Sequence, residues 1–127
     1  MKIAIFENEF DQIEYSFKLV NRLYYNDELK FEIFTKSQEF KNIENIINYD
    51  LIFIDLDLSV NSDLDGYSLI RKFIALNKKL PIVILTGAAM VEESLKKKSL
   101  PPFEILLKPL DYKKLFKIFQ YYIKPSE

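Results

Sequence analysis

Five short runs of large apolar residues alternate with longer mixed segments along the 127-residue chain, and this alternation limits the possible folds more than any other feature. A strand that is apolar at successive positions is buried on both faces, which is typical of a parallel sheet covered by helices on both sides. The pattern therefore predicts an α/β fold, a doubly wound (βα)5 sheet. The expected strands are residues 2–6, 31–35, 51–54, 82–85 and 103–107.

The first and last helices are predicted from apolar residues at helical spacing. Residues 11–14 have the composition of a capping box, which predicts where the first helix begins. Asp111 is expected to cap the last helix. The side chains expected to face the core are Ile13, Phe17, Val20 and Tyr24 in the first helix and Leu115, Phe116, Phe119, Tyr122 and Ile123 in the last.

Three shorter segments between the later strands are also expected to be helical. In the first of them, Phe40, Ile43 and Ile47 are expected on the apolar side. The expected helices span residues 37–47, 67–76 and 91–98.

The chain has no cysteine and no histidine, and these absences exclude several classes of chemistry. Disulfides, thiolate nucleophiles and cysteine-type zinc sites all need cysteine. Ser-His-Asp triads and imidazole general bases need histidine. Any chemistry of this chain must therefore use carboxylates, lysines, hydroxyls and backbone groups.

The net charge of -1 gives no overall field that would favour nucleic acid or a membrane surface. No apolar run approaches the roughly 18 residues of a membrane span, and the first residues show no signal-peptide pattern. We therefore expect one cytoplasmic domain over residues 1–127 that binds neither membrane nor nucleic acid directly.

Polar residues follow the expected strands at the edge where doubly wound sheets bind their ligands. A single acid at such a position is usually a helix cap, and a single lysine is usually solvated. The prediction of a functional site therefore depends on the order in which acids, a hydroxyl and a lysine follow successive strands. Clustered carboxylates call for a hard cation with oxygen ligands, which favours Mg²⁺. A carboxylate beside such an ion can attack phosphorus, with a hydroxyl and a lysine holding the phosphoryl oxygens. The residues at the strand ends are Glu7 and Asn8, Asp55 and Asp57, Thr86, and Lys108.

This arrangement resembles the receiver domains of two-component response regulators, and the resemblance covers nearly the whole chain. It implies a CheY-like, flavodoxin-like fold with strand order 2-1-3-4-5, and a cis peptide bond before Pro109. The motifs that carry it are residues 3–9, 50–55, 65–66, 81–87 and 106–109.

The resemblance also implies a function. Asp55 would accept a phosphoryl group from a histidine kinase or a phosphotransfer protein, and Thr86 and Lys108 would contact that group. Receivers are not enzymes in the usual sense, beyond taking up and losing this group. The Mg²⁺ ligands would be Glu7, Asn8, Asp55 and Asp57, the last through its backbone carbonyl.

Three features of the sequence depart from the family pattern. Asn8 stands where receivers usually have a second acid, which removes one negative charge from the metal site. Ile105 stands where they usually have the aromatic residue that turns inward on activation. The loop between Asp55 and Asp65 is longer than usual and carries Asp63. These departures leave open a degenerate receiver that acts as a phosphorylation-independent interaction module.

A second alternative is an enzyme. Residues 55–59 also resemble the nucleophile motif of haloacid-dehalogenase-type phosphatases, in which the second aspartate is the acid/base. The order of the chain argues against this reading, because that family begins with its nucleophile strand, whereas here Glu7 comes first.

The last helix is the expected surface for a partner. Residues 96–127 contain eight lysines and three acids, so this part of the chain is basic. We expect an apolar and basic face that meets an acidic output partner or a second copy of the chain. That face comprises Lys113, Lys114, Lys117, Ile118, Tyr121 and Lys124.

Overall fold

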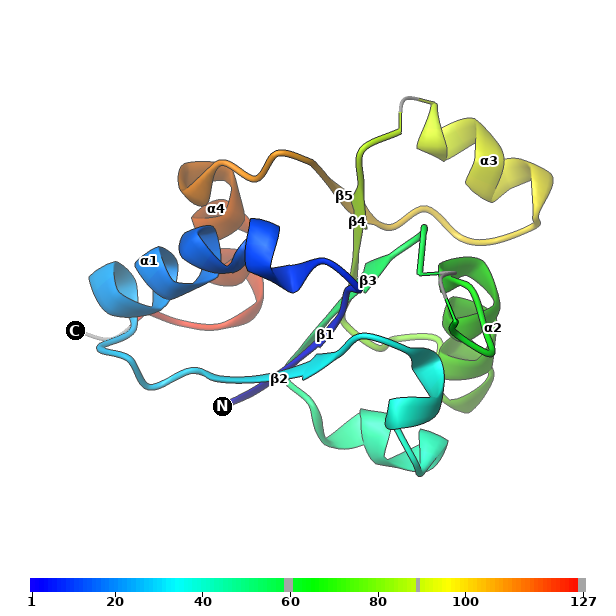
Figure 1. Cartoon of the computed structure of the whole chain (residues 1–127), viewed down its shortest axis with the longest axis horizontal. Helices are drawn as coiled ribbons and strands as arrows, with labels where there is room; N and C mark the ends of the chain where they lie inside the picture. Colours follow the sequence, from blue (N-terminus) through cyan, green and yellow to red (C-terminus); the bar gives the residue numbers. More distant parts are fainter. Residues whose placement is uncertain (59–60, 89, 126–127) are drawn as a thin grey trace.

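A computed structural model describes residues 1–58, 61–88 and 90–125 (Figure 1). Its centre is a sheet of five parallel strands in the order β2-β1-β3-β4-β5, as the resemblance implied. Ser59 of the alternative phosphatase motif lies outside the described residues. The strands are β1 (Lys2–Phe6), β2 (Lys30–Phe34), β3 (Leu51–Asp55), β4 (Ile82–Thr86) and β5 (Glu104–Leu107).

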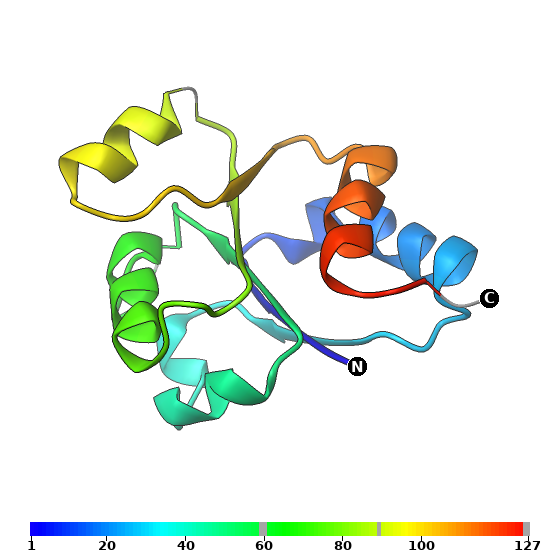
Figure 2. The same ribbon diagram turned by 180° about the vertical axis from the view of Figure 1, so that it is seen from behind.

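Helices cover both faces of the sheet. Two of them, α1 and α4, lie side by side on one face, and α2 and α3 lie on the other side (Figures 1 and 2). No helix of the described residues is long and apolar enough to span a membrane. The α-helices are α1 (Glu14–Tyr24), α2 (Gly66–Leu76), α3 (Val91–Lys97) and α4 (Tyr112–Tyr122), and the 3-10 helices are η1 (Phe10–Gln12), η2 (Ser37–Glu39) and η3 (Ile43–Asn48).

The core has two halves, one on each face of the sheet. Between the sheet and α1, the rings of Phe17 and Phe53 meet edge to face with centroids 5.1 Å apart. On the other face, the rings of Phe6 and Phe73 lie 5.6 Å apart. Burial of each such ring stabilises the fold by about 1.5–3 kcal/mol, so the aromatic residues fix how the layers stack.

The capping box predicted at residues 11–14 is wrong. The 3-10 helix η1 occupies this segment, and α1 begins at Glu14 with no side-chain cap. Backbone hydrogen bonds replace the side-chain cap: Gln12 N–H donates to Glu9 O at 3.0 Å, and Ile13 N–H donates to Phe10 O at 2.9 Å. Those bonds satisfy amide groups that a side-chain cap would otherwise bind.

The helix predicted over residues 37–47 is also wrong, because η2 and η3 replace it. A 3-10 helix has three residues per turn, so Ile43 and Ile46 share one face and Ile47 lies on another. Ile46 is fully buried, whereas the side chain of Ile47, which was expected to face inward, is 58% exposed. The helix fails because Phe40 is extended and the segment is rich in asparagine, a weak helix former.

The remaining helices follow the prediction closely. Asp111 caps α4, accepting a hydrogen bond from Lys113 N–H at 2.9 Å. Leu115, Phe119 and Ile123 are buried as expected, and Phe116 and Tyr122 are half-buried.

Candidate functional site

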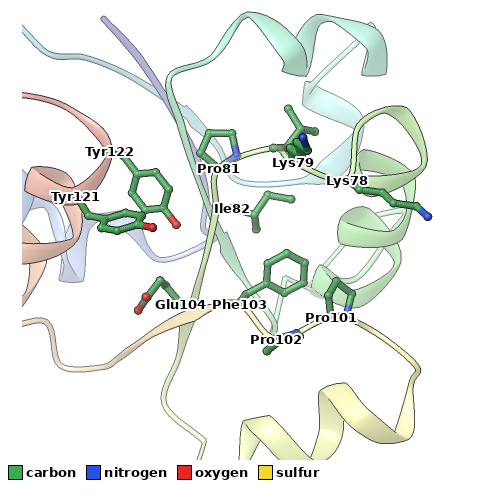
Figure 3. Close-up of a pocket in the computed structure, with 11 residues that line it drawn as sticks. Lys78, Lys79, Pro81, Ile82, Pro101, Pro102, Phe103, Glu104, Tyr121 and Tyr122 are labelled. Carbon is green, nitrogen blue, oxygen red and sulfur yellow. The ribbon is translucent and has the colours of Figure 1, made fainter.

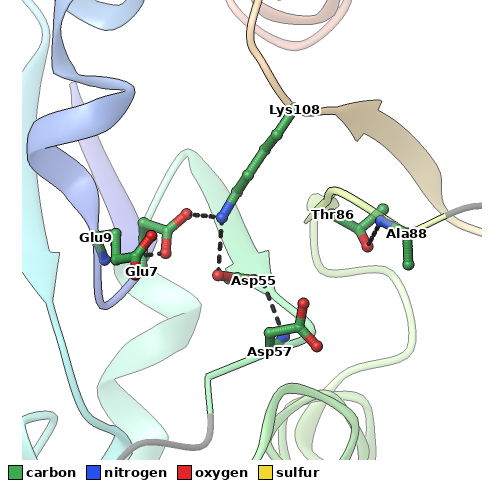
Figure 4. A network of polar contacts seen from close by, with 7 residues as sticks. All are labelled: Glu7, Glu9, Asp55, Asp57, Thr86, Ala88 and Lys108. Atoms are coloured by element: carbon green, nitrogen blue, oxygen red, sulfur yellow. Dashed lines mark hydrogen bonds and ion pairs between the residues drawn. The ribbon is translucent and has the colours of Figure 1, made fainter.

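The carboxyl ends of β1, β3, β4 and β5 bring four of the predicted side chains to one edge of the sheet (Figure 4). Asp55 and Thr86 are the last residues of β3 and β4. Glu7 follows β1, and its N–H donates to Phe34 O at 3.0 Å. Lys108 follows β5, and its N–H donates to Thr86 O at 2.8 Å. The backbone ladder thus continues one residue past two strands and fixes where these side chains start.

Three charged groups meet at the centre of this site. The Lys108 ammonium donates a hydrogen bond to Asp55 Oδ2 at 2.9 Å and forms an ion pair with Glu7 Oε1. Glu7 is fully buried and Asp55 is 2% exposed. Buried carboxylates need a counter-charge, and one lysine supplies it to both.

The other oxygen of each carboxylate is held by the backbone. Asp57 N–H donates to Asp55 Oδ1 at 2.9 Å, and Glu9 N–H donates to Glu7 Oε2 at 3.1 Å. Each donor lies two residues after its acceptor, so the turn that ends the strand also orients the carboxylate.

The single positive charge of Lys108 does not fully compensate the negative charges of Glu7 and Asp55. Burial, together with the neighbouring Asp55 carboxylate, raises the pKa of Glu7 to about 7, and Lys108 only partly offsets this. Burial alone would lower the pKa of Lys108, but its contacts with Glu7 and Asp55 prevail and raise that pKa. The site therefore holds a firmly charged lysine and can accommodate a second positive charge.

Thr86 lies on the other side of Asp55 from Glu7, because β3 separates β1 from β4 in the sheet (Figure 4). Its side chain is buried, and its Oγ1 accepts a hydrogen bond from Ala88 N–H at 3.0 Å. That bond leaves the hydroxyl proton available as a donor.

The predicted metal ligands are only partly brought together. Asn8 is half-buried directly after Glu7, and Asp57 is exposed. Within the described ranges, no group of three or more aspartate, glutamate, histidine or cysteine side chains is arranged to hold a metal ion. Among the described residues, the carboxylates at the centre are those of Glu7 and Asp55, so the magnesium assignment stays a prediction.

Gly66 supports Asp55 in a way that the sequence did not reveal. A Cβ at Gly66 would lie 2.4 Å from Asp55 O and 2.6 Å from Leu56 Cα. The start of α2 therefore packs directly on the backbone of Asp55, and only glycine fits there. The Asp65–Gly66 motif was a signal for a turn but not for this contact.

The segment 61–64 between Asp57 and α2 is held by η2. Gln38 Nε2 donates to Asn61 O at 2.7 Å, and Asp63 N–H donates to Gln38 Oε1 at 2.9 Å. Ser37 Oγ accepts from Leu64 N–H at 2.9 Å. These bonds join residues about 25 positions apart in the chain, so no local pattern could have predicted them.

Ile105 lies half-buried in β5 and packs against the core on the side of α2 and α3. The Lys108–Pro109 peptide bond is cis, which confirms that expectation of the resemblance.

Comparison with known proteins identifies a matching family and similar folds. Residues 7–120 match the response regulator receiver domain family. The fold is similar to the receiver domain of NtrX from Brucella abortus, with a TM-score of 0.75 at 18% identity over 98% of this chain and 99% of the other.

Two further structures are similar. One is the signal receiver domain of a DNA-binding response regulator (merR) from Colwellia psychrerythraea 34H, with a TM-score of 0.76 at 17% identity over 98% of each chain. The other is the receiver domain of the sensor histidine kinase PA1611 from Pseudomonas aeruginosa PAO1, with magnesium in its active-site cleft. Its TM-score is 0.71 at 22% identity over 96% of each chain. No curated protein sequence matches.

Proposed function

The chain belongs to the response regulator receiver domain family, and from this we propose that it accepts a phosphoryl group on Asp55. The observation that best supports the proposal is the contact of Lys108 Nζ with Asp55 Oδ2 at 2.9 Å, at the buried end of β3. A histidine kinase or a histidine phosphotransfer protein would supply the group.

The residues around Asp55 suit this transfer. One Asp55 oxygen attacks the phosphorus of a phosphohistidine, and the new O–P bond forms as the donor N–P bond breaks, with the electron pair left on nitrogen. Lys108 gives up one carboxylate contact to bind a phosphoryl oxygen. The Thr86 hydroxyl donates a hydrogen bond to another, so both residues respond to the new charge.

The oxygen donors at this edge fit Mg²⁺. Glu7 and Asp55 are buried carboxylates that share one ammonium, so a divalent ion beside them would relieve their repulsion. The proposed ligands are Glu7, Asp55, the Asn8 amide oxygen and the Asp57 backbone carbonyl. When bound, Mg²⁺ neutralises negative charge on the phosphoryl oxygens during transfer.

The exposed face of α4 is the proposed output surface, for an output partner or a second copy. Lys114 and Lys117 are exposed there, and the side chain of Tyr121 is 80% exposed. Ile118 contributes less than expected, because it is half-buried and packs against the core. Phosphorylation would bias two conformations that differ in how this face is presented.

Intact mass spectrometry tests the acceptor. The wild-type chain and Asp55→Asn are each incubated with Mg²⁺ and acetyl phosphate. We expect the mass of one phosphoryl group on the wild type alone, in stoichiometric amount and without turnover. An adduct on both proteins would contradict Asp55 as the acceptor. Steady phosphate release from a phosphomonoester would instead favour a phosphatase.

A further inference from the structure

A hollow of about 500 Å³ lies at the amino ends of β4 and β5, at the opposite end of these strands from Asp55 and Thr86. Figure 3 shows Tyr121 and Tyr122 on one side and Phe103 on the other, with Ile82 between them. We call the space bounded by these four residues the tyrosine groove. The two tyrosine rings meet edge to face, with centroids 4.9 Å apart.

The fold does not require an aromatic side chain at Tyr121. Leu115 and Phe119 supply the buried side of α4, whereas Tyr121 is 80% exposed and Tyr122 half-buried. Tyrosine presents a large, rigid surface with little entropy to lose, and it is enriched where interfaces concentrate their binding energy. The exposed Tyr121, held against the half-buried Tyr122 beside a hollow, therefore offers an aromatic surface for a partner.

The tyrosine groove continues into a second hollow of about 350 Å³, which shares Glu104 and both tyrosines and extends along α4. Lysines lie at both ends of this combined space. Lys78 and Lys79 line the first hollow, and Lys114 and Lys117 line the second. In the described part of the chain, none of these four lysines forms a salt bridge, and Glu104 is the single acid against them.

The floor of the second hollow includes the edge strand β5. The N–H of Lys108 donates to Thr86 O on β4. Every second residue before Lys108 in β5 therefore also directs its backbone N–H and C=O toward β4. The backbone N–H and C=O of Ile105 therefore point outward. An unpaired strand edge of this kind can hydrogen-bond an extended chain.

We propose that this combined space binds an extended acidic segment of a partner protein. The segment places an apolar side chain between the tyrosine pair and Phe103, and its carboxylates reach the lysines at either end. The inference extends the output surface proposed on α4 and rests on that proposal for its lysine end, but it does not depend on phosphorylation of Asp55.

Charge and geometry favour this occupant over two others. A second copy would bring two basic grooves together, which repel each other. A single-stranded nucleic acid would bring phosphates to Glu104 in the middle of the path, and the edge-to-face tyrosines do not form a parallel platform for stacked bases.

Selection from a random twelve-residue phage library tests the proposal on the full chain. We expect enriched peptides to carry several acids around one apolar residue. For the best synthetic peptide, Tyr121→Ala should weaken binding about tenfold or more, and Lys79→Glu and Lys114→Glu should also weaken it, less so at high salt. Tyr15→Ala is the matched control, because the Tyr15 side chain is 74% exposed on α1 and should leave binding unchanged.

Several results would overturn the proposal. Enrichment of basic or neutral peptides, no enrichment at all, or equal binding by Tyr121→Ala would exclude an acidic partner at this groove. If a thymidine dodecamer binds more tightly than the best peptide, and Tyr121→Ala abolishes that binding, the groove binds nucleic acid instead. A dimer that Tyr121→Ala dissociates, seen by analytical ultracentrifugation, would assign it to a second copy. Phosphorylation of the wild type is measured separately, so either proposal can fail alone.

Discussion

The two oxygens of Asp55 have different partners, and this difference decides which of them can react. Oδ1 is held by Asp57 N–H at 2.9 Å within its own turn. Oδ2 is held by the flexible side chain of Lys108, which Glu7 also binds. A lysine can move to a new anion at little cost, whereas a turn amide cannot. Oδ2 is therefore the oxygen we expect to react.

Replacement of Asn8 should reveal the magnesium site. Asn8→Asp adds a carboxylate directly after Glu7, so Mg²⁺ affinity should rise about tenfold, because ligand charge sets affinity for hard cations. Isothermal titration calorimetry measures the change. Asn48→Asp, at an exposed position at the end of η3, is the matched control. Equal or weaker binding by Asn8→Asp would place the ion elsewhere.

Removal of the lysine should destabilise the site itself. Lys108→Met leaves two buried carboxylates without their counter-charge, and we expect the free energy of unfolding to fall by about 1–3 kcal/mol. Magnesium should restore part of this loss if it binds the same carboxylates. Urea unfolding with and without Mg²⁺ measures both effects. Unchanged stability would mean that the ion pairs contribute nothing.

At the scale of elements, the strands were predicted better than the short helical segments between the early strands. A strand buried on both faces has an apolar signature that few other structures share, as residues 51–54 show. The segment 37–48 has apolar residues at spacings of three and four, which fit both an α-helix and a 3-10 helix. The extended backbone at Phe40 divides the segment into two 3-10 helices, and this break is not visible in the apolar pattern.

Contact between α2 and β3 gives a prediction at this scale. Gly66→Ala forces a Cβ against Asp55 O, so the free energy of unfolding should fall by about 1–3 kcal/mol and phosphorylation of Asp55 should slow. Gly87→Ala is the control for stability, because nothing lies within 4 Å of its added Cβ. Equal urea midpoints for the two variants would contradict the close packing seen here.

At the scale of the whole molecule, Tyr25 connects the C-terminal ends of two helices that are far apart in the sequence. Its hydroxyl donates to Ile123 O at 2.8 Å and so ties the end of α1 to the end of α4. Tyr25→Phe leaves that carbonyl unpaired in a buried position, and the free energy of unfolding should fall by about 1–2 kcal/mol. Tyr24→Phe is the neighbouring control. A loss no greater than that of Tyr24→Phe would show that the bond is not needed.

Tyr25 also gives a pH dependence. Burial raises the pKa of Tyr25 to about 12 from an ordinary value of 10.0. Above pH 10 the unfolded chain loses this proton while the folded chain keeps it, so the contribution of Tyr25 is complete below pH 10 and is lost as pH rises toward 12. Alkaline unfolding of Tyr25→Phe should lack this component. An identical alkaline profile in both proteins would contradict it.

Much of the molecule was predictable because parallel strands bring their carboxyl ends to one edge. That rule placed Glu7, Asp55, Thr86 and Lys108 together from sequence alone. It could not show that one lysine serves both acids, that Gly66 packs on Asp55, or that η2 holds the loop before α2. Those contacts depend on side-chain reach and packing between distant segments, which the order of residues does not encode locally.

A crystal structure of the wild type with Mg²⁺ and beryllofluoride, a mimic of the phosphoryl group, tests the central proposal most directly. We expect beryllium bonded to an Asp55 carboxylate oxygen, with the Lys108 ammonium and the Thr86 hydroxyl on the fluorides and Mg²⁺ between Glu7 and Asp55. An adduct on another residue, or a Lys108 that stays on Glu7 and Asp55 with no adduct at saturating beryllofluoride, would contradict it.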